Sequence, residues 1–323
     1  MDERFQTVWD ERLAPWLAEL EEERKRVVRL RWIWLGVGVA VGLIGAAAFF
    51  GVIEDPGPLM FLIILGPFLG FIIGNTGVAS LAKRIKLELN MTIAETLGLT
   101  YQLKPYAPAR FDRLRTFGLL PSSDRQTFED HFTGERDGCD FELYEADLKQ
   151  RRKTGKSTSY VTVFRGVIIR ITFPRKVEGI TVISRDQGVF NGLNALGRSF
   201  GGVKLERIGL VDPVFEKAFE VYGNDQVLAR YMLTPSFMER LLALETTLKG
   251  KNVRALFDQD SGQGELIIAA ETGNLFEAGS MLKPLTEEGR FSKIIDDLNH
   301  ITALIDLLIA PSALNEHEAR QGV

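Results

Sequence analysis

Two long runs of uncharged, mostly apolar residues constrain this chain more than any other feature of its sequence. The first, Trp32 to Ile53, holds 22 residues, and as a helix it would reach about 33 Å at ~1.5 Å per residue. The second runs from Leu59 to Ala79 and also lacks charge. A hydrocarbon core is about 30 Å thick, so each run is long enough to cross it. Buried helices of a soluble protein, the alternative, would each need some charged residue. We therefore predict two transmembrane helices, over about 32–53 and 59–81.

The segment between the spans, Glu54 to Pro58, is short and contains two prolines and a glycine. It leaves room only for a turn, so the two spans should be antiparallel neighbours. Basic residues lie on the other side of both spans: Arg24, Lys25, Arg26, Arg29, Arg31, Lys83, Arg84 and Lys86. By the positive-inside rule both termini are expected in the cytoplasm. The N-terminal 31 residues mix acids and bases, unlike a signal peptide. The single cysteine, Cys139, fits a reducing compartment.

Small residues recur at four-residue spacing in both spans, and such stripes let helix backbones approach closely in lipid. They are Gly38, Gly42 and Ala46 in the first span and Gly66, Gly70 and Gly74 in the second. The pattern predicts tight helix packing, either within the hairpin or between copies of the chain. Neither span has an ionisable residue, which favours an anchor over a transport path.

Helical patterns extend beyond the spans on both sides. Residues 4–31 carry an apolar stripe of Phe5, Trp9, Trp16, Leu20 and Val27, so we expect residues 1–31 to form a cytoplasmic amphipathic helix. Its acidic middle argues against lying flat on an anionic membrane and favours packing on itself or on the C-terminal domain. After the second span the pattern continues to Gly98, which predicts a stalk helix over 82–100.

Residues 101–310 read as a cytoplasmic α+β domain with an antiparallel sheet, and 311–323 as a polar tail. Strands are expected at 141–148, 160–173, 179–184, 203–207, 220–222, 253–257 and 265–270, with Gly166 as a bulge and 149–159 and 188–202 as loops. Helices are expected at 109–117, from Asp124 to His131, after the Asp212–Pro213 and Thr234–Pro235 caps, and over about 287–309. The strands come in hairpin runs, without the alternation of a parallel doubly wound sheet.

The loop at 149–159 holds five cations within eight residues: Lys149, Arg151, Arg152, Lys153 and Lys156. A solvated hairpin tip explains them, and the sharper hypothesis is contact with anionic lipid or an acidic partner. Thr154 to Thr158 matches the end of a phosphate-binding P-loop, but position 150 is Gln where that motif needs glycine, and a strand follows where a helix should. A nucleotide site is therefore not expected.

No catalytic, cofactor or metal site is predicted. His131, His300 and His317 have no zinc-ligand spacing with one another or with Cys139. The acidic pairs at 287–288 and 296–297 diverge around a helix, and there is no nucleophile elbow. A net charge of −4 offers no general attraction to nucleic acid. An enzyme with a scattered active site stays open as an alternative.

Three stretches resemble a bacterial membrane family: FEDHFTGERDGCDFELYEADL, YVTVFRGVIIRITFP and DPVFEKAFEVYGNDQVLARYMLTPSFMERLLAL. This is the uncharacterised two-span family known as domain-of-unknown-function family 3137. The resemblance implies paired N-terminal spans, a soluble domain of this kind and a location in the bacterial inner membrane. It implies no activity and no functional residue.

Three functions follow as hypotheses. The preferred one is a non-enzymatic membrane-anchored scaffold or interaction protein that presents its cytoplasmic domain and self-associates or binds a protein partner. The second is a regulatory module that binds a ligand or lipid headgroup through the basic loop. The third is a membrane-bound enzyme without a recognisable motif. The expected partners are the lipid bilayer, further copies of the chain and a protein partner, with no cofactor and no nucleic acid.

Overall fold

The computed structural model describes residues 3–50, 56–105, 108, 110–155, 157–173, 179–185, 198–200, 202–247, 250–260, 262–287, 292, 294–296, 298–299 and 301–302. The chain forms two compact units. The first contains Met1–Thr96 and Phe276–Ile295, and the second contains Leu97–Leu275 and Asp296–Val323.

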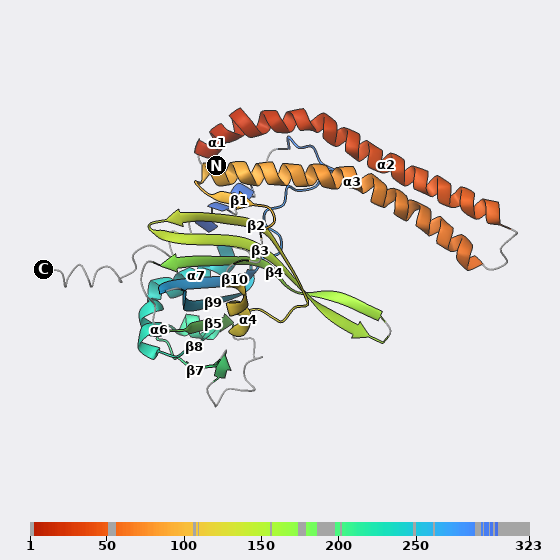
Figure 1. Ribbon diagram of the computed structural model, residues 1–323. Helices are drawn as coiled ribbons and strands as arrows, with labels where there is room; N and C mark the ends of the chain where they lie inside the picture. The colour runs from red at the N-terminus through yellow and green to blue at the C-terminus, as the bar shows by residue number, and fades with distance from the viewer. Residues whose placement is uncertain are drawn as a thin grey trace. The chain divides into compact units, whose positions relative to one another are not determined.

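Two long helices make up most of the first unit and lie side by side (Figure 1). The chain begins with α1 (Glu3–Val8) and a π-helical turn (Trp9–Leu13), continues into α2 (Ala14–Phe49) and returns along α3 (Pro56–Thr96). Residues 51–55, which include Glu54 and Asp55 of the expected turn, lie outside the described residues, whereas Pro56 to Pro58 already belong to α3. Each apolar segment is therefore part of one unbroken helix that also includes its charged flank.

The N-terminal apolar stripe differs from the predicted one. Phe5, Leu13 and Leu17 are buried, whereas Trp16 is only half-buried. The π-helical turn explains the difference, because it precedes Pro15, which has no N–H to donate and whose ring crowds the preceding turn. The wider turn shifts the phase of the helix after it.

The second unit is built on an antiparallel sheet, which confirms the predicted α+β class (Figure 1). Within the described residues the sheet has ten strands in the order β1-β2-β3-β4-β10-β9-β5-β8-β7-β6. Their bounds are β1 Thr100–Gln102, β2 Arg125–Arg136, β3 Cys139–Thr154, β4 Ser157–Phe173, β5 Thr181–Arg185, β6 Arg198–Phe200, β7 Val203–Arg207, β8 Phe219–Gly223, β9 Lys251–Asp260 and β10 Gln263–Glu271. The helices are α4 Phe111–Thr116, α5 Pro213–Ala218, α6 Gln226–Met232 and α7 Pro235–Thr247.

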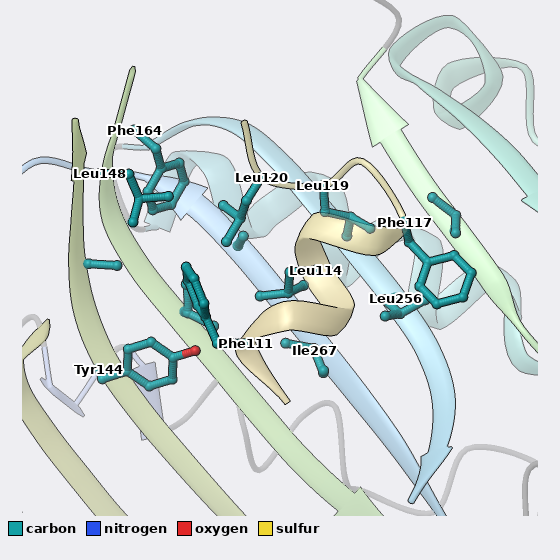
Figure 2. Packing of buried hydrophobic residues seen from close by; sticks show 14 of the residues in the cluster. Phe111, Leu114, Phe117, Leu119, Leu120, Tyr144, Leu148, Phe164, Leu256 and Ile267 are labelled. Carbon is teal, nitrogen blue, oxygen red and sulfur yellow. The ribbon is translucent and has the colours of Figure 1, made fainter. Parts of the chain in front are cut away.

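A core lies between α4 and one face of the sheet (Figure 2). Phe111, Leu114 and Phe117 of α4 pack with apolar side chains from several strands, among them Tyr144, Leu148, Phe164, Leu256 and Ile267. Full burial of such a side chain is worth about 1.5–3 kcal/mol. The short helix is thus held by its burial, since six residues are too few for a stable isolated helix.

Two predicted helix caps are confirmed. The Asp212 carboxylate accepts hydrogen bonds from the Val214 and Phe215 N–H groups at 2.8 and 3.0 Å. The Thr234 hydroxyl accepts one from the Phe237 N–H at 3.2 Å. Asp225 caps α6 in the same way, a helix that the sequence analysis missed.

Three local predictions are wrong. Residues after Asp124 form strand β2, because the Asp124 carboxylate accepts the Arg151 N–H instead of capping a helix. The loop expected at 149–159 is strand on both sides of a tight turn. Gly166 pairs regularly with Ala146, and the register shift falls between Leu148 and Lys149. A Cβ at Gly166 would lie 1.9 Å from the Ala270 oxygen, so close backbone approach requires the glycine.

Two further predictions fall largely outside the described residues. Of the loop expected over 188–202, the structure describes strand β6 and residue 202. Of the helix expected over about 287–309, the residues described from 292 onward are helical.

Candidate functional site

The two small-residue stripes face each other within the hairpin. A Cβ placed on Gly66 would lie 2.2 Å from the Gly38 oxygen, and one on Gly70 would lie 2.3 Å from the Trp34 oxygen. Gly42 faces the Leu62 backbone, Gly74 faces Arg31, and Ala46 is buried. The structure therefore places both stripes in one interface between α2 and α3, where only glycine permits the observed approach of the backbones.

The basic residues lie on a two-stranded extension of the sheet. Strand β2 pairs with β3 as far as Lys149, and β10 pairs with β4 only from Val167 onward. Beyond these points β3 and β4 pair with each other up to Thr154 and Ser157 (Figure 1). We call Gln150–Val161 the basic arm. Each of its strands reaches about 17 Å at ~3.3 Å per residue.

The sequence accounts for this extension. Thr158, Tyr160 and Val161 are β-favouring residues, and Gly155 at the turn has φ +61°, which suits a tight hairpin. This run of β-favouring residues is the sequence signal for the extension, although the many charges in 149–159 are typical of a polar loop.

The arm has two chemically different faces, because residues paired across a ladder point to the same side. Arg151 is paired with Tyr160 and Lys153 with Thr158, whereas Arg152 is paired with Ser159. Arg125 of β2 is paired with Lys149, and its guanidinium lies 3.7 Å from the centre of the Tyr160 ring. The side with Arg125, Lys149, Arg151, Lys153 and Tyr160 is here called the basic face. Lys156 lies outside the described residues.

Two carboxylates hold the base of the arm. Asp124 accepts the Arg151 N–H at 2.7 Å and donates its own N–H to the Lys149 oxygen at 2.9 Å. Asp147 pairs with Lys149 at 3.2 Å and with Arg165 at 2.5 Å. Burial acts to raise the pKa of Asp147, but the hydrogen bonds from Arg165 and Lys149 outweigh it and leave the pKa below its ordinary value. Asp147 thus offsets cations at the base of the arm, while the arm itself, Gln150–Val161, contains no acid.

A row of ion pairs crosses one face of the sheet and ends at α4. Arg113 and Arg110 both bind Asp258, Arg110 and Arg170 both bind Glu265, and Arg170 and His131 both approach Glu142. Asp258 is 2% exposed and Glu265 is 0% exposed. We call these seven residues the charged row. Acids and bases alternate along the row and pair with one another. These ion pairs give the buried Asp258 and Glu265 a structural role.

A groove of about 460 Å³ lies beside one end of the charged row, over strands β1 to β4. Its polar lining includes Thr100, Thr133, Glu135, Asp140, Glu142 and Arg170. Glu142 and Arg170 already pair with each other at 3.5 Å and with further members of the row. The groove thus offers hydroxyl and carboxylate groups, and two of its acids, Glu135 and Asp140, are direct partners across β2 and β3.

The structure places part of the P-loop-like stretch and one of the three histidines. Thr154 and Ser157 lie in strands, so the residues that resemble a P-loop end do not open a helix. His131 approaches Glu142 at 3.1 Å, and His300 and His317 lie outside the described residues.

Comparison with known proteins gives one family. Residues 162–309 match the family described as "Protein of unknown function (DUF3137)". With the two apolar helices near the N-terminus, this match is consistent with a two-span protein of that family and confirms the resemblance noted in the sequence. No curated protein matches the chain. Among solved structures it is similar to the "crystal structure of the mycobacterial trehalose monomycolate transport factor A, TtfA", at 12% identity and a TM-score of 0.33, over 71% of this chain and 99% of that one.

Proposed function

We propose that this chain, a two-span DUF3137 protein, is a non-enzymatic membrane-anchored interaction module. In this proposal α2 and α3 cross the bacterial inner membrane, both termini lie in the cytoplasm, and the second unit is held at the cytoplasmic side to engage its partners.

The apolar outer surface of the helix pair carries this proposal. In the most apolar 18-residue window of each helix, only 11% is buried in the chain's own fold. Large side chains such as Ile44, Phe61 and Val41 are 68%, 61% and 60% exposed. In water such a surface would cost about 25 cal/mol per Å² of apolar area. A core helix of a soluble protein would be covered by its own chain, so a lipid environment fits these helices better.

The flanking charges support the orientation. Arg29 and Arg31 in α2 and Lys83 and Arg84 in α3 all lie at the same end of the apolar segments. Cationic residues are retained on the cytoplasmic side of bacterial spans. Arg84 of α3 also pairs with Glu23 of α2, so the two helices stay in contact beyond their apolar segments.

The non-enzymatic part rests on the charged side chains of the second unit. Seven of those on its sheet and on α4 are held in the charged row, with short contacts between acid and base. A catalytic acid or base needs access to a substrate proton, which a paired buried carboxylate does not have.

Self-association is a separate part of the proposal and no longer follows from the glycine stripes. In this structure the stripes are occupied by α2 and α3 of one chain, so an interface between copies needs another surface. The mass of the protein in detergent or nanodiscs tests it: a dimer or larger assembly supports self-association, and a monomer at all concentrations rejects it.

The topology can be tested with single cysteines. In a Cys139→Ser background, Gly57→Cys lies at the exposed start of α3 and Ser236→Cys lies on the exposed surface of α7. A membrane-impermeant maleimide added to intact spheroplasts should label Gly57→Cys at once and Ser236→Cys only after permeabilisation. The chain with its native Cys139 is the control. Labelling of Ser236→Cys in intact spheroplasts, or release of the chain by alkaline carbonate, would reject the proposed anchoring.

A further inference from the structure

The basic arm is exposed on both sides. Among its described residues, Arg151 to Gly155 and Ser157 to Val161 are all exposed. It carries Arg151, Arg152, Lys153 and Lys156 without an acid. The arm buries too little side-chain surface to belong to an apolar core. The β3–β4 hairpin extends beyond the neighbouring strands (Figure 1), and its described cations are exposed.

The basic face is also the side that carries an aromatic ring. Tyr160 is 38% exposed and lies beneath the Arg125 guanidinium. Lys149, Arg151 and Lys153 occupy alternate positions of β3 on this side, so with Arg125 they form a strip of four cations beside a tyrosine. Val161 is 37% exposed on the opposite side. Cations around a tyrosine suit a membrane interface, where an aromatic ring sits at headgroup level.

We propose that the basic face binds the anionic phospholipid headgroups of the membrane in which the chain is anchored. This inference rests on the proposed function, because the hairpin is what keeps the arm close to a bilayer. Each basic residue near an anionic surface strengthens binding about five-fold, from ~1 kcal/mol per residue. Three or four residues alone bind weakly, and a tether converts this weak contact into an intramolecular one.

The shape and charge of the arm favour a lipid surface over other anionic partners. A strip of exposed side chains suits a surface of many equivalent headgroups better than one small ligand that needs enclosure. Nucleic acid is disfavoured, because the chain has a net charge of −4.

A fluorescent reporter on the arm tests the contact in the full-length chain. Thr158→Cys in the Cys139→Ser background, labelled with an environment-sensitive dye, reports from the basic face beside Lys153. The labelled chain is reconstituted in phosphatidylcholine vesicles with and without the anionic lipid phosphatidylglycerol, which gives the surface the negative potential of a cytoplasmic leaflet. We expect a blue shift and brighter emission only with phosphatidylglycerol, reversed by about 1 M salt, since the Debye length is then ~3 Å.

Adjacent arginines provide a matched control. Arg151→Glu and Arg152→Glu change the net charge equally, but Arg151 lies on the basic face and Arg152 on the other side. We expect Arg151→Glu to reduce the ratio of bound to free arm at least about five-fold, the loss of one basic contact. Arg152→Glu should reduce it less than two-fold. Equal losses, or no loss in either variant, would overturn the assignment of the face. Circular dichroism of each variant shows that it is folded.

Two further outcomes separate this inference from its alternatives. A spectral change in neutral vesicles on adding an RNA oligonucleotide or polyglutamate, without a response to phosphatidylglycerol, would overturn it in favour of that partner. Flotation of the chain with neutral vesicles after carbonate treatment reports on the anchor alone. Firm flotation without a dye response rejects the lipid contact and leaves the proposed anchor standing, and loss of flotation rejects the anchor.

Discussion

At the scale of single residues, Arg110 shows how one side chain stabilises an unfavourable backbone. Its φ of +63° lies in the left-handed region, which typically costs a non-glycine residue about 1–3 kcal/mol. The guanidinium donates to Glu265 at 2.7 Å, to Asp258 at 2.8 Å and to the Gln259 oxygen at 2.8 Å. These bonds offset the strain and hold the first residue of the α4 region against the sheet.

Replacement of Arg110 should therefore destabilise the second unit. Arg110→Gln leaves Glu265 and Asp258 each with one cation fewer, and removing one partner of a buried ion pair costs about 3–5 kcal/mol. We expect the Tm in detergent to fall by about 10 °C, at roughly 2–4 °C per kcal/mol. Arg115→Gln on the same helix is the control, because its pair with exposed Asp112 at 3.6 Å is worth little. Similar Tm values for both variants would show that the charged row does not stabilise the fold.

At the scale of elements, the α2–α3 pair depends on glycine at defined positions. Gly66 and Gly38 approach each other so closely that each would place a Cβ against the other's backbone oxygen. Lipid supplies no hydrophobic drive between helices, so this close backbone packing is a main source of their association. Gly36 in the same helix has nothing within 4 Å of a built Cβ.

These two glycines give a matched pair of substitutions. Gly66→Ala should force the helices apart and destabilise the hairpin by about 1–3 kcal/mol, the usual cost of overpacking. Gly36→Ala should be neutral or slightly stabilising, because alanine favours helix by about 1 kcal/mol over glycine. Unfolding of the full chain in increasing sodium dodecyl sulfate, followed by helical circular dichroism, measures both. Equal stability of the two variants would contradict the packing of α2 on α3.

At the scale of the whole molecule, the chain returns to the first unit after residue 275 of the second unit. Residues 276–285, here called the strap, lie on the helix pair and belong to the first unit. Arg24 binds Glu21 through two hydrogen bonds, at 2.7 and 2.9 Å, and donates to the Met281 oxygen at 3.0 Å. Glu21 also accepts the Leu285 N–H at 2.9 Å. Lys86 pairs with Glu277 at 2.9 Å, so side chains of both α2 and α3 hold the strap.

The strap should loosen in acid. The hydrogen bond from Arg24 holds the pKa of Glu21 below its ordinary value against the opposing effect of burial, and the Leu285 N–H adds to the lowering. Because the pKa is lowered in the folded chain, the Glu21 carboxylate stabilises the strap fully at pH values above the ordinary glutamate pKa of 4.5. This stabilisation is lost as the pH falls through the lowered pKa of the folded chain.

Hydrogen exchange of residues 276–287 measures this effect. Once corrected for the intrinsic pH dependence, protection in the native chain should be lost as the pH falls below the ordinary glutamate pKa of 4.5, whereas Glu21→Gln should show weak protection at every pH. Glu22→Gln is the control, because Glu22 pairs only with exposed Lys25 among the described residues. Unchanged protection in Glu21→Gln would show that the strap is held by other contacts.

Patterns that are local along the chain were predictable. The two apolar segments, the glycine spacing and the caps at Asp212 and Thr234 depend on residues within a turn or two of each other. The α+β class followed from hairpin runs of β-favouring residues. The cations of the candidate site were named from the sequence, all except Arg125.

The sequence by itself therefore determined the apolar helices, the class of the sheet and the cluster of charge, because each is written in neighbouring residues. Only the tertiary structure decided where distant segments pair. Residues 149–159, expected to be a loop, form the arm because β3 and β4 pair with each other beyond the ends of their neighbouring strands. Long-range pairing also brought Arg110 to Asp258 and Glu265. The pairing of β3 with β4 also divides the arm's cations between two faces. This division can be read from the residue order only when the strand positions are known.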